Sequence, residues 1–516
     1  MARSGQRLHS GVVGGESLRA EQGHQETEFG QAGTNAPGSI KSLLALLLLV
    51  NLSMSIYQLP LNRVIERRLC REYYAEHSLP SVRPGQDVDE QLCKVDAVQK
   101  ELAWIQGAME TAWIIGDFVM TIPLGFMVER YDRRTVLWLN LVPRICMLAW
   151  AVIVGSSEQL LPTKAIIAAP FLSVLGGDCI FNSLTLALAS DLTEDRVLRA
   201  SYFGYMSSTS YAVSLLGPAL ASASMSLFLW LPFCIGIMLL LIAVQAVHSL
   251  PTEQFRFPAA DDMEGHRQPL LSSPRLKAQD RQRSLASSVL YRFDVIRSIV
   301  ASHPWNFSLL LISFFLTSLA SSDTKLLVQY ISKRYKWTFS SAGYLLSGKA
   351  VVNFTLLTVV IPRLLKKRAE SLHLTSYPHS QDITNVTYAR SCLIVSILGA
   401  LAIAFASTIW LLIPSLLLYA LGSALPIFTL SLLKSPLVSP PPSPDVIASL
   451  GNPETHIFSI VMLVKTLGSL VGAPLMASAW IWGIATGGFT FGLPYFVSAV
   501  CYGLATIIFS GIKVDG

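Results

Sequence analysis

Apolar runs long enough to cross a membrane recur along nearly the whole chain, separated by shorter polar segments. A transmembrane helix needs about 20 consecutive apolar residues. Each run here is roughly 18 to 27 residues long. The pattern therefore predicts an all-α integral membrane protein with twelve transmembrane helices. The runs begin near residues 42, 103, 135, 164, 201, 227, 305, 340, 390, 410, 456 and 491.

A long hydrophilic segment after residue 250 divides the spans into two groups of six. Two bundles of six helices, joined by one linker, follow from this division. A longer polar connection comes after the first span, and a Pro-rich one comes after the tenth. The expected boundaries are a cytoplasmic tail at 1–40, a first bundle at 41–250 with an extramembrane loop at 61–100, a cytoplasmic linker at 251–303, and a second bundle at 304–511 with a Pro-rich cytoplasmic loop at 434–453.

Basic residues in the connections predict the orientation. Lys and Arg gather in the linker and in the loops after the second and eighth spans, all on one side of the expected membrane. Cytoplasmic loops normally carry this excess of positive charge. We therefore expect a multi-pass membrane protein with both termini in the cytoplasm, and we favour the plasma membrane over the vacuolar membrane.

Composition supports a membrane protein and excludes several other classes. The chain is 52% hydrophobic and 14% charged, whereas about a quarter of an average soluble domain is charged. The net charge of +6 is not gathered into a basic stripe with aromatic residues, so nucleic acid is not an expected partner. The lipid bilayer is the expected surrounding, and the chain is expected to act as a monomer.

A phosphate-loop spacing occurs once, from Gly343 to Gly348-Lys349. Ala350 stands where a Ser or Thr hydroxyl would bind Mg²⁺, and the segment lies inside an apolar span. ATP is therefore not an expected ligand. With no zinc-type His or Cys motif either, we expect no cofactor and no enzymatic activity.

Two cysteines lie outside the apolar runs, at Cys70 and Cys93. They bracket the polar segment after the first span, which would face an oxidising compartment if the N-terminus is cytoplasmic. A disulfide between them is one interpretation. Two free thiols is the other.

The two halves of the chain repeat a pattern of small residues and Pro. The fifth span contains Gly217-Pro218, and the eleventh, at the matching place, contains Gly472-Ala473-Pro474. Paired repeats with interrupted helices are typical of transporters that alternate about a central site. Small residues also simply allow helices to pack closely, so both interpretations stay open.

A charged loop follows the second span, reading Gly125-Phe-Met-Val-Glu129-Arg130-Tyr-Asp132-Arg133-Arg134. It resembles the loop motif of the major facilitator superfamily, with Glu129 for the usual Asp and Asp132 for the customary second Gly. The resemblance implies a charge relay that holds the helices in one state. A loop that only sets topology is the alternative. The residues expected in this conformational switch are Gly125, Glu129, Arg130, Asp132, Arg133 and Arg134, with Asp191 and Arg199 after the fourth span as partners.

The fifth span is similar to the antiporter motif of exporters in that superfamily, over Gly204, Val213 and Gly217-Pro218. Three of the motif's glycines are replaced. The segment Cys70-Arg71-Glu72-Tyr73-Tyr74 is similar to the fungal branch of the superfamily. The resemblance implies the twelve-helix fold of that family and favours export.

Five ionisable residues in the spans are candidates for substrate binding or proton coupling, because a charge at mid-depth is costly unless it is paired or hydrated. The resemblance places the fourth and seventh spans around the cavity, and the second, eighth and eleventh at the interface between the halves. A permanent ion pair that fixes the bundle is the alternative for Asp117 and Lys465. Asp178 and Asp323 are thus cavity candidates, and Asp117, Lys349 and Lys465 are interface candidates.

Together these features predict a secondary carrier that moves a small organic molecule by alternating access. Proton-coupled efflux of a metabolite or drug-like compound leads, with Asp117 or Asp178 exchanging the proton and the proton gradient as the driving force. Proton-coupled uptake of a nutrient or vitamin-like solute is the alternative. A membrane receptor or scaffold without flux is a remote third.

Overall fold

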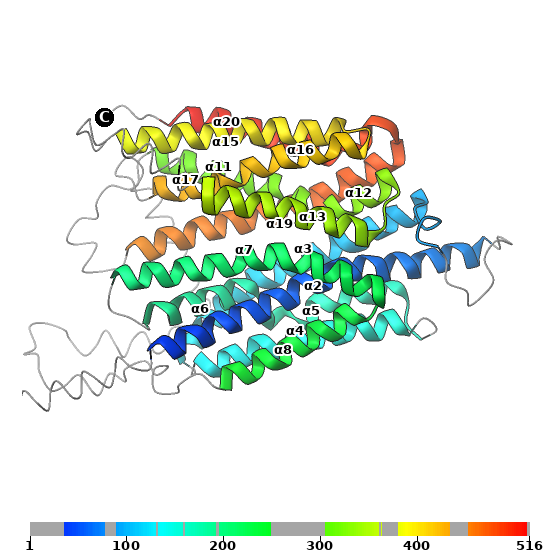
Figure 1. The fold of residues 1–516 in the computed structure, drawn as a ribbon, viewed down its shortest axis with the longest axis horizontal. Coiled ribbons are helices and arrows are strands. Elements are labelled where there is room, and N and C mark those ends of the chain that lie inside the picture. The colour runs from blue at the N-terminus through cyan, green and yellow to red at the C-terminus, as the bar shows by residue number, and fades with distance from the viewer. Residues whose placement is uncertain are drawn as a thin grey trace, which may run out of the picture.

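The computed structural model describes residues 36–77, 89–130, 133–157, 160–191, 196–248, 305–360, 363, 380–433 and 453–512. These residues form helices and short connections, without a strand among them. Twelve helical rods result, some of them interrupted (Figure 1). The prediction of an all-α fold with twelve spans is confirmed.

The first six rods make up the first half of the molecule. The fourth is built from four short helices in succession, and the other five are single helices. In chain order they are α2 (Ala36–Glu76), α3 (Asp96–Arg130), α4 (Arg133–Ser156), the group η1 (Thr163–Ala168), α5 (Ala169–Leu172), η2 (Val174–Gly176) and α6 (Asp178–Asp191), then α7 (Arg196–Leu227) and α8 (Leu231–His248).

The second half holds the other six. In chain order they are α11 (Trp305–Ser321) with η4 (Ser322–Lys325) and α12 (Leu327–Tyr335), α13 (Phe339–Thr355) with η5 (Leu356–Val360), α15 (Ser380–Phe405), α16 (Ile409–Leu421) with η6 (Gly422–Ala424) and α17 (Leu425–Leu433), α19 (Pro453–Thr486), and η7 (Gly488–Gly492) with α20 (Leu493–Ser510).

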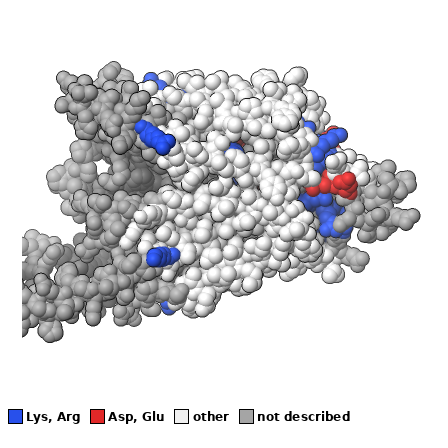
Figure 2. Space-filling model, in the orientation of Figure 1, with Lys and Arg blue, Asp and Glu red and all other residues white. Residues whose placement is uncertain are grey.

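Length and apolar composition show that the chain crosses a membrane several times. Within the described ranges, nine helices are long and apolar enough to span, and Thr163–Leu172 is a shorter apolar helix. Figure 2 shows the matching surface: a broad band without charge lies between two charged ends. Such a band is what the hydrocarbon core of a bilayer requires. The protein is therefore a multi-pass membrane protein.

The two halves repeat the same helix packing. In the first half α2 packs on α7 and α8, and in the second the equivalent α11 packs on α19 and α20. The halves meet mainly where α3 packs on α19 and where α7 packs on α13, with a smaller contact of α2 with α13. In Figure 1 the first half forms the lower part of the molecule and the second half the upper part. The predicted pseudo-repeat is present in space.

The repeated Gly-Pro segments lie at equivalent crossings of this packing. An added Cβ at Gly217 in α7 would lie 2.0 Å from Ser55 Oγ of α2, and one at Gly472 in α19 would lie 2.4 Å from Ser322 Oγ of η4. Pro218 and Pro474 follow inside the same two helices. A residue without a side chain is therefore required at both crossings.

The extramembrane segment expected at 61–100 is not a loop throughout, which corrects the sequence prediction. Helix α2 continues to Glu76, past Pro60, and α3 begins at Asp96. Helix α2 has 41 residues, or roughly 60 Å at 1.5 Å per residue, whereas the hydrocarbon core is about 30 Å thick. Its last turns project beyond the bundle (Figure 1). We call residues 61–76 the α2 extension.

A disulfide joins the α2 extension to the segment before α3. Cys70 and Cys93 are bonded, with their Cα atoms 5.3 Å apart, and both are fully buried. The first described helix, α2, begins at the opposite end of the bundle, and the last one, α20, ends there as well (Figure 1). The α2 extension thus marks one end of the molecule, and the described chain ends mark the other.

Candidate functional site

A break in the fourth rod positions two acids. Helix η2 ends at Gly176, Gly177 is extended, and α6 starts at Asp178. A Cβ at Gly177 would lie 2.3 Å from Asp117 Oδ1, so a side chain at this position would displace the carboxylate of Asp117. The backbone N–H of Cys179 donates to Asp117 Oδ1 at 3.2 Å. The carboxylate of Asp117 therefore lies at the N-terminus of α6, where a negative charge is stabilised.

Arg144 of α4 binds the second of these acids. Its Nη2 lies 2.9 Å from Asp178 Oδ1; Arg144 is fully buried, while half of the Asp178 side chain is exposed. Arg144 Nε donates to Asn140 Oδ1 at 3.1 Å, and Asn140 Nδ2 donates to the carbonyl of Gly177 at 2.9 Å. A guanidinium cannot lose its proton in a protein, so this buried cation requires an acid beside it.

One ion pair connects this region to the second half. Lys325 Nζ of η4 lies 2.9 Å from Glu110 Oε1 of α3. Glu110 precedes Asp117 by seven residues, two turns, and so shares its face of the helix. We call Glu110, Asp117, Arg144, Asp178 and Lys325 the polar network. This pair joins an acid of the first half to a base of the second.

Lys465, one of the interface candidates, lies on α19. Among the residues that the structure describes, no acid pairs with its ammonium group, and its carbonyl accepts a hydrogen bond from Ser318 Oγ at 2.6 Å. Asp117 accepts a hydrogen bond from the N–H of Cys179, and Lys349 lies beside the ring of Tyr419. The assignment of Asp117, Lys349 and Lys465 to the interface between the halves stays a prediction.

Asp323 forms a second polar cluster, in the second half. It is fully buried, so it does not line an open cavity as expected. Tyr419 O–H lies 3.0 Å from both carboxylate oxygens of Asp323 and 3.2 Å from the hydroxyl of Tyr502. Lys349 Nζ lies 5.3 Å from the centre of the Tyr419 ring. The 3₁₀ turn η4 carries both Asp323 and Lys325, and so joins this cluster to the polar network.

Most of the expected switch loop lies outside the described residues. Asp132 is among the residues left undescribed, as are the side chains of Glu129, Arg130, Arg133, Asp191 and Arg199. The surroundings of Gly125 and Gly204 are also left undescribed. Arg134 is described. Its Nη2 donates to the carbonyl of His248 at 2.7 Å, which ties the start of α4 to the end of α8.

Polar contacts hold the two halves together at the end marked by the α2 extension. Glu90 Oε1 accepts a hydrogen bond from the N–H of Phe339, at the start of α13, at 2.7 Å. Lys333 of α12 lies 2.5 Å from Asp96 of α3. Figure 2 shows acids and bases gathered at this end. We call these two cross-half pairs the outer contacts.

A buried acid of the first half, Glu66, supports the residues that make the outer contacts. Glu66 of the α2 extension is fully buried and pairs with Lys94 at 2.7 Å and with Arg63 at 2.9 Å. Lys94 also lies 3.2 Å from Glu90. Two bases around one buried carboxylate compensate its lost hydration, so the carboxylate that binds α13 is held in place by this cluster.

Comparison with known proteins identifies the family. The family model described as Major Facilitator Superfamily matches residues 99–473, more than two thirds of the chain. The chain belongs to this superfamily. Membership makes it a transporter of the kind that the charged loop and the repeat predict.

The similar curated proteins are fungal transporters. The "MFS efflux pump atnC" of Emericella nidulans is 27% identical over 464 residues, covering 90% of this chain and 85% of that protein. The "Efflux pump ustT" of Aspergillus flavus is 25% identical over 470 residues, covering 89% and 85%. The resemblance to the fungal branch is thereby confirmed.

Solved structures share the fold. The D-xylose-proton symporter superposes with a TM-score of 0.57 at 12% identity, covering 92% of this chain and 98% of its own. The human organic anion transporter MFSD10 gives a TM-score of 0.54 at 15% identity, covering 92% and 99%. At these identities the likeness shows the fold alone.

Sequence reasoning missed the partners that complete both clusters. Arg144 stood out only as a base in an apolar span, and the signal for its role was Asn140, four residues earlier on the same helix face. Tyr419 and Tyr502 gave no signal, because tyrosine is common in apolar spans and a hydroxyl contact across three helices leaves no pattern along the chain.

Proposed function

We propose that this transporter is a secondary carrier that exports a small organic molecule in exchange for protons. The observation that carries the proposal is the polar network, which places three carboxylates and two bases on facing helices of both halves. Intramembrane groups of this kind are characteristic of proton and substrate pathways. The proposal needs no ATP and no bound cofactor, because the proton gradient drives the cycle, and it assigns no catalytic activity.

Two acids beside one permanent cation suit proton exchange. Asp178 is half exposed and is bound to Arg144. Asp117 lies beside Gly177, the residue directly before Asp178. If Asp178 takes up a proton, the guanidinium loses its partner, and the nearby carboxylate of Asp117 offers another. Protonation would therefore change which acid Arg144 binds. We assign Asp178 as the proton-exchanging group and Asp117 as the acid that compensates Arg144.

The Glu110–Lys325 pair suits the conformational part of the cycle. It joins α3 of the first half to η4 of the second, so it must break when these two elements separate. A part-exposed ion pair contributes little to stability, so it can break and re-form as the bundle rocks. Charge changes at Asp178 act on the same network and would bias this step.

Export is favoured by two features. The fifth span keeps part of the exporter spacing, and relatives such as atnC and ustT are named efflux pumps. The basic loops lie on the side of the molecule where α2 begins and α20 ends, which supports a cytoplasmic location for both termini. We propose the plasma membrane as the site of export, and a monomer as the working unit.

The test begins by finding a probe. A yeast strain that overproduces the full chain is screened against a panel of toxic organic compounds, and a compound to which it becomes resistant is labelled. Flux of that compound is then measured in proteoliposomes, with and without a pH gradient. We expect a pH gradient that is acidic on the side of the α2 extension to drive the compound across the membrane towards that side. Flux in the opposite direction would establish uptake instead.

The variants Asp178→Asn and Asp117→Asn test the assigned roles. Asp178→Asn should retain exchange of labelled for unlabelled compound but lose the response to the pH gradient. Glu76→Gln, at the exposed end of α2, is the matched control and should behave as wild type. Unchanged proton-driven flux in both Asn variants would overturn the coupling assignment.

A further inference from the structure

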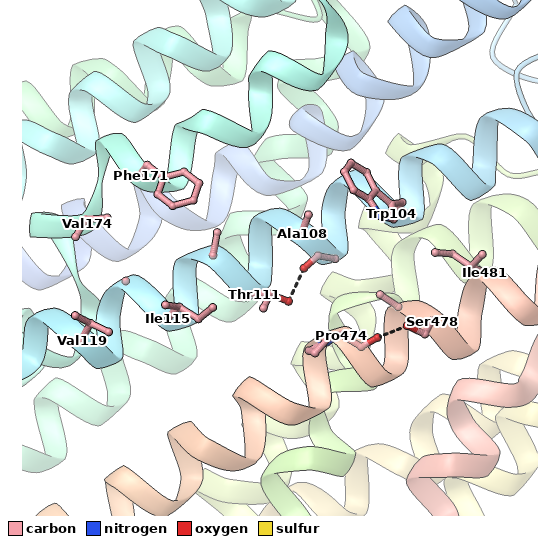
Figure 3. Close-up of a pocket in the computed structure, with 14 residues that line it drawn as sticks. Trp104, Ala108, Thr111, Ile115, Val119, Phe171, Val174, Pro474, Ser478 and Ile481 are labelled. Carbon is pink, nitrogen blue, oxygen red and sulfur yellow. Dashed lines mark hydrogen bonds between the residues drawn. The ribbon is translucent and has the colours of Figure 1, made fainter.

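An apolar cleft opens on the outside of the helix bundle, between α3, the broken fourth rod and α19 (Figure 3). Its volume is about 580 Å³. Large apolar side chains from all three elements line it, among them Trp104, Ile115, Phe171 and Ile481. A cleft of this size can take one long chain of a small amphipathic molecule.

The cleft faces away from the polar network. Its lining residues on α3 follow one another at intervals of three and four, as in Ala108, Ile115 and Val119, and so form one stripe. At 100° per residue, Glu110 and Asp117 lie about half a turn around the helix from this stripe. The helix therefore presents its acids to the polar network and its apolar stripe to the cleft.

The cleft is also open to the surroundings. Ile115 is 46% exposed, Val119 56% and Phe171 64%. Within a membrane span, exposed apolar side chains meet hydrocarbon. The cleft is thus accessible from the bilayer.

The hydroxyls inside the cleft are already satisfied. Thr111 donates to the carbonyl of Gly107 at 2.7 Å, and Ser478 donates to the carbonyl of Pro474 at 2.8 Å (Figure 3). Hydroxyls that bond to their own helix offer little to a polar solute. The wall of the cleft therefore suits a hydrocarbon chain.

One end of the cleft carries a pair of opposite charges beside an aromatic ring. Lys164 Nζ lies 3.0 Å from Glu101 Oε1, with 65% and 38% of the two side chains exposed. The same ammonium lies 5.7 Å from the centre of the Trp104 ring, which lines the cleft. Tryptophan is enriched where lipid headgroups meet the hydrocarbon core. This end of the cleft is therefore at headgroup level.

We propose that the cleft binds one phospholipid with a choline headgroup, from the leaflet on the side of the α2 extension. Lys164 binds the phosphate, and Glu101 with the face of Trp104 binds the quaternary ammonium. From Trp104 to Val119 the stripe is about 22 Å long at 1.5 Å per residue, which exceeds the ~15 Å of one leaflet. An acyl chain of that leaflet fits along its full length.

The two halves form opposite walls of this site. Helix α3 belongs to the first half and α19 to the second, and an added Cβ at Gly107 would lie 2.5 Å from the Cβ of Ala477. The helices therefore touch beneath the cleft, and rocking of one half changes its width. Lipid in the cleft binds the two conformations differently, and so shifts the equilibrium between them.

The test uses the full chain in vesicles of phosphatidylcholine with a small fraction of a photoactivatable phosphatidylcholine that carries a diazirine on its acyl chain. After illumination, labelled peptides are mapped by mass spectrometry. We expect labelling concentrated on the peptides of α3 and α19. The same probe with a phosphatidylglycerol headgroup should label these peptides about threefold less, the size of effect expected of one exposed ion pair or cation–π contact.

Two variants separate the chain site from the headgroup site. Ala108→Phe fills the cleft and should abolish the α3 and α19 labelling, whereas Ile242→Phe, on the exposed face of α8, should leave it unchanged. Glu101→Lys removes the negative charge and should reverse the headgroup preference towards phosphatidylglycerol. This second variant changes only an exposed side chain, so it remains informative if the first one fails to fold.

Three outcomes would overturn the proposal. The first is labelling of α3 and α19 no stronger than that of α8, which would describe an ordinary lipid-facing surface. The second is equal labelling by both headgroups in the wild type, which would remove the role of Lys164 and Glu101. The third is competition by the exported compound, since the cleft would then be a substrate site.

Discussion

At the scale of single residues, Gly177 determines the geometry of the proton-exchanging site. Its missing side chain allows Asp117 to reach the N-terminus of α6, since a Cβ there would lie 2.3 Å from Asp117 Oδ1. The Asn140 side chain binds the carbonyl of the same residue at 2.9 Å. One glycine thus positions an acid from α3 and an amide from α4 around the break before Asp178.

Gly177→Ala should therefore destabilise the protein and abolish transport. The added methyl group must displace the Asp117 carboxylate from the N–H of Cys179, and loss of a hydrogen bond to a charged group costs about 1.5–3 kcal/mol. Thermal unfolding of the purified chain, followed together with flux of the labelled compound, measures both effects. Gly503→Ala is the control, because a Cβ at Gly503 meets nothing within 4 Å. Equal unfolding temperatures in the two variants would contradict the prediction.

Tyr419→Phe should destabilise the second half of the molecule. It removes the hydroxyl that lies 3.0 Å from both oxygens of the buried Asp323, and a buried acceptor without its donor costs about 1–3 kcal/mol. Thermal unfolding provides the measurement. In the double variant with Asp323→Asn, the two effects should not add, because the residues are in contact.

A control for Tyr419→Phe is Tyr388→Phe. The ring of Tyr388 packs on Phe428, with 5.3 Å between centroids, and this contact survives the substitution. Its unfolding temperature should change little, since loss of a hydroxyl with no buried partner is a small effect. Additive losses in the Asp323 and Tyr419 double variant would show that the two groups do not interact.

Candidate residues were predictable at this scale, but their contacts were not. Acids in apolar spans stand out because a membrane makes them costly, so Asp117, Asp178 and Asp323 could be named from the sequence. Which side chain binds each of them depends on how each helix is rotated against its neighbours. That rotation is a result of packing over many residues, so the partners of these side chains could not be predicted from the sequence.

At the scale of helices, the α2 extension is the feature that the sequence reading missed. Its polar residues were read as a loop. Yet Leu61, Val64, Ile65 and Leu69 recur at helical spacing and are all buried, which is the pattern of an amphipathic helix. The twelve spans were found because each contains a long apolar run, whereas an amphipathic continuation of a span changes composition without ending the helix.

Removing the disulfide should loosen this element. The bond joins Cys70 and Cys93, which are 23 positions apart in the sequence, and loss of a disulfide of that span typically costs about 2–4 kcal/mol. Cys70→Ser should therefore lower the unfolding temperature. A reducing agent should lower that of the wild type to a similar value and leave the variant unchanged.

Cys146→Ser is the matched control, since Cys146 is an exposed free thiol on α4. It should unfold as the wild type does, with the same response to a reducing agent. If reduction lowers the unfolding temperature of Cys70→Ser as much as that of the wild type, then the stabilising bond lies elsewhere.

At the scale of the whole molecule, the duplication could be read from the sequence, and the relation between the halves could not. Gly217 and Gly472 marked matching helices, and they do lie at equivalent crossings. How the halves meet is decided by contacts such as Lys325 with Glu110, which join residues more than 200 positions apart. Such contacts depend on the conformational state of the bundle as well as on its fold.

The outer contacts hold the bundle closed at the end of the α2 extension, so weakening them should open that end. Lys333→Ala removes the pair with Asp96, and Glu90→Ala removes the carboxylate that binds the N–H of Phe339. Each contact is partly solvated, so we expect the ratio of open to closed molecules to rise about two- to fivefold per substitution. Spin labels at Glu76 and Trp410, one on each half, measure the distance distribution across this end.

The control must break an ion pair at the same end of the molecule and leave the contacts between the two halves unchanged. Lys164→Ala does so when all variants are measured in detergent without phospholipid, because Lys164 pairs with Glu101 inside the first half and no lipid then occupies the cleft; the distance distribution should stay as in the wild type. The double variant of Lys333 and Glu90 should show a larger open fraction than either single one, since the two contacts join different helices of the second half. An unchanged distribution in that double variant would mean that the closed outer end is held by the apolar packing of α3 on α19 and of α7 on α13, and that the outer contacts only follow the rocking of the bundle.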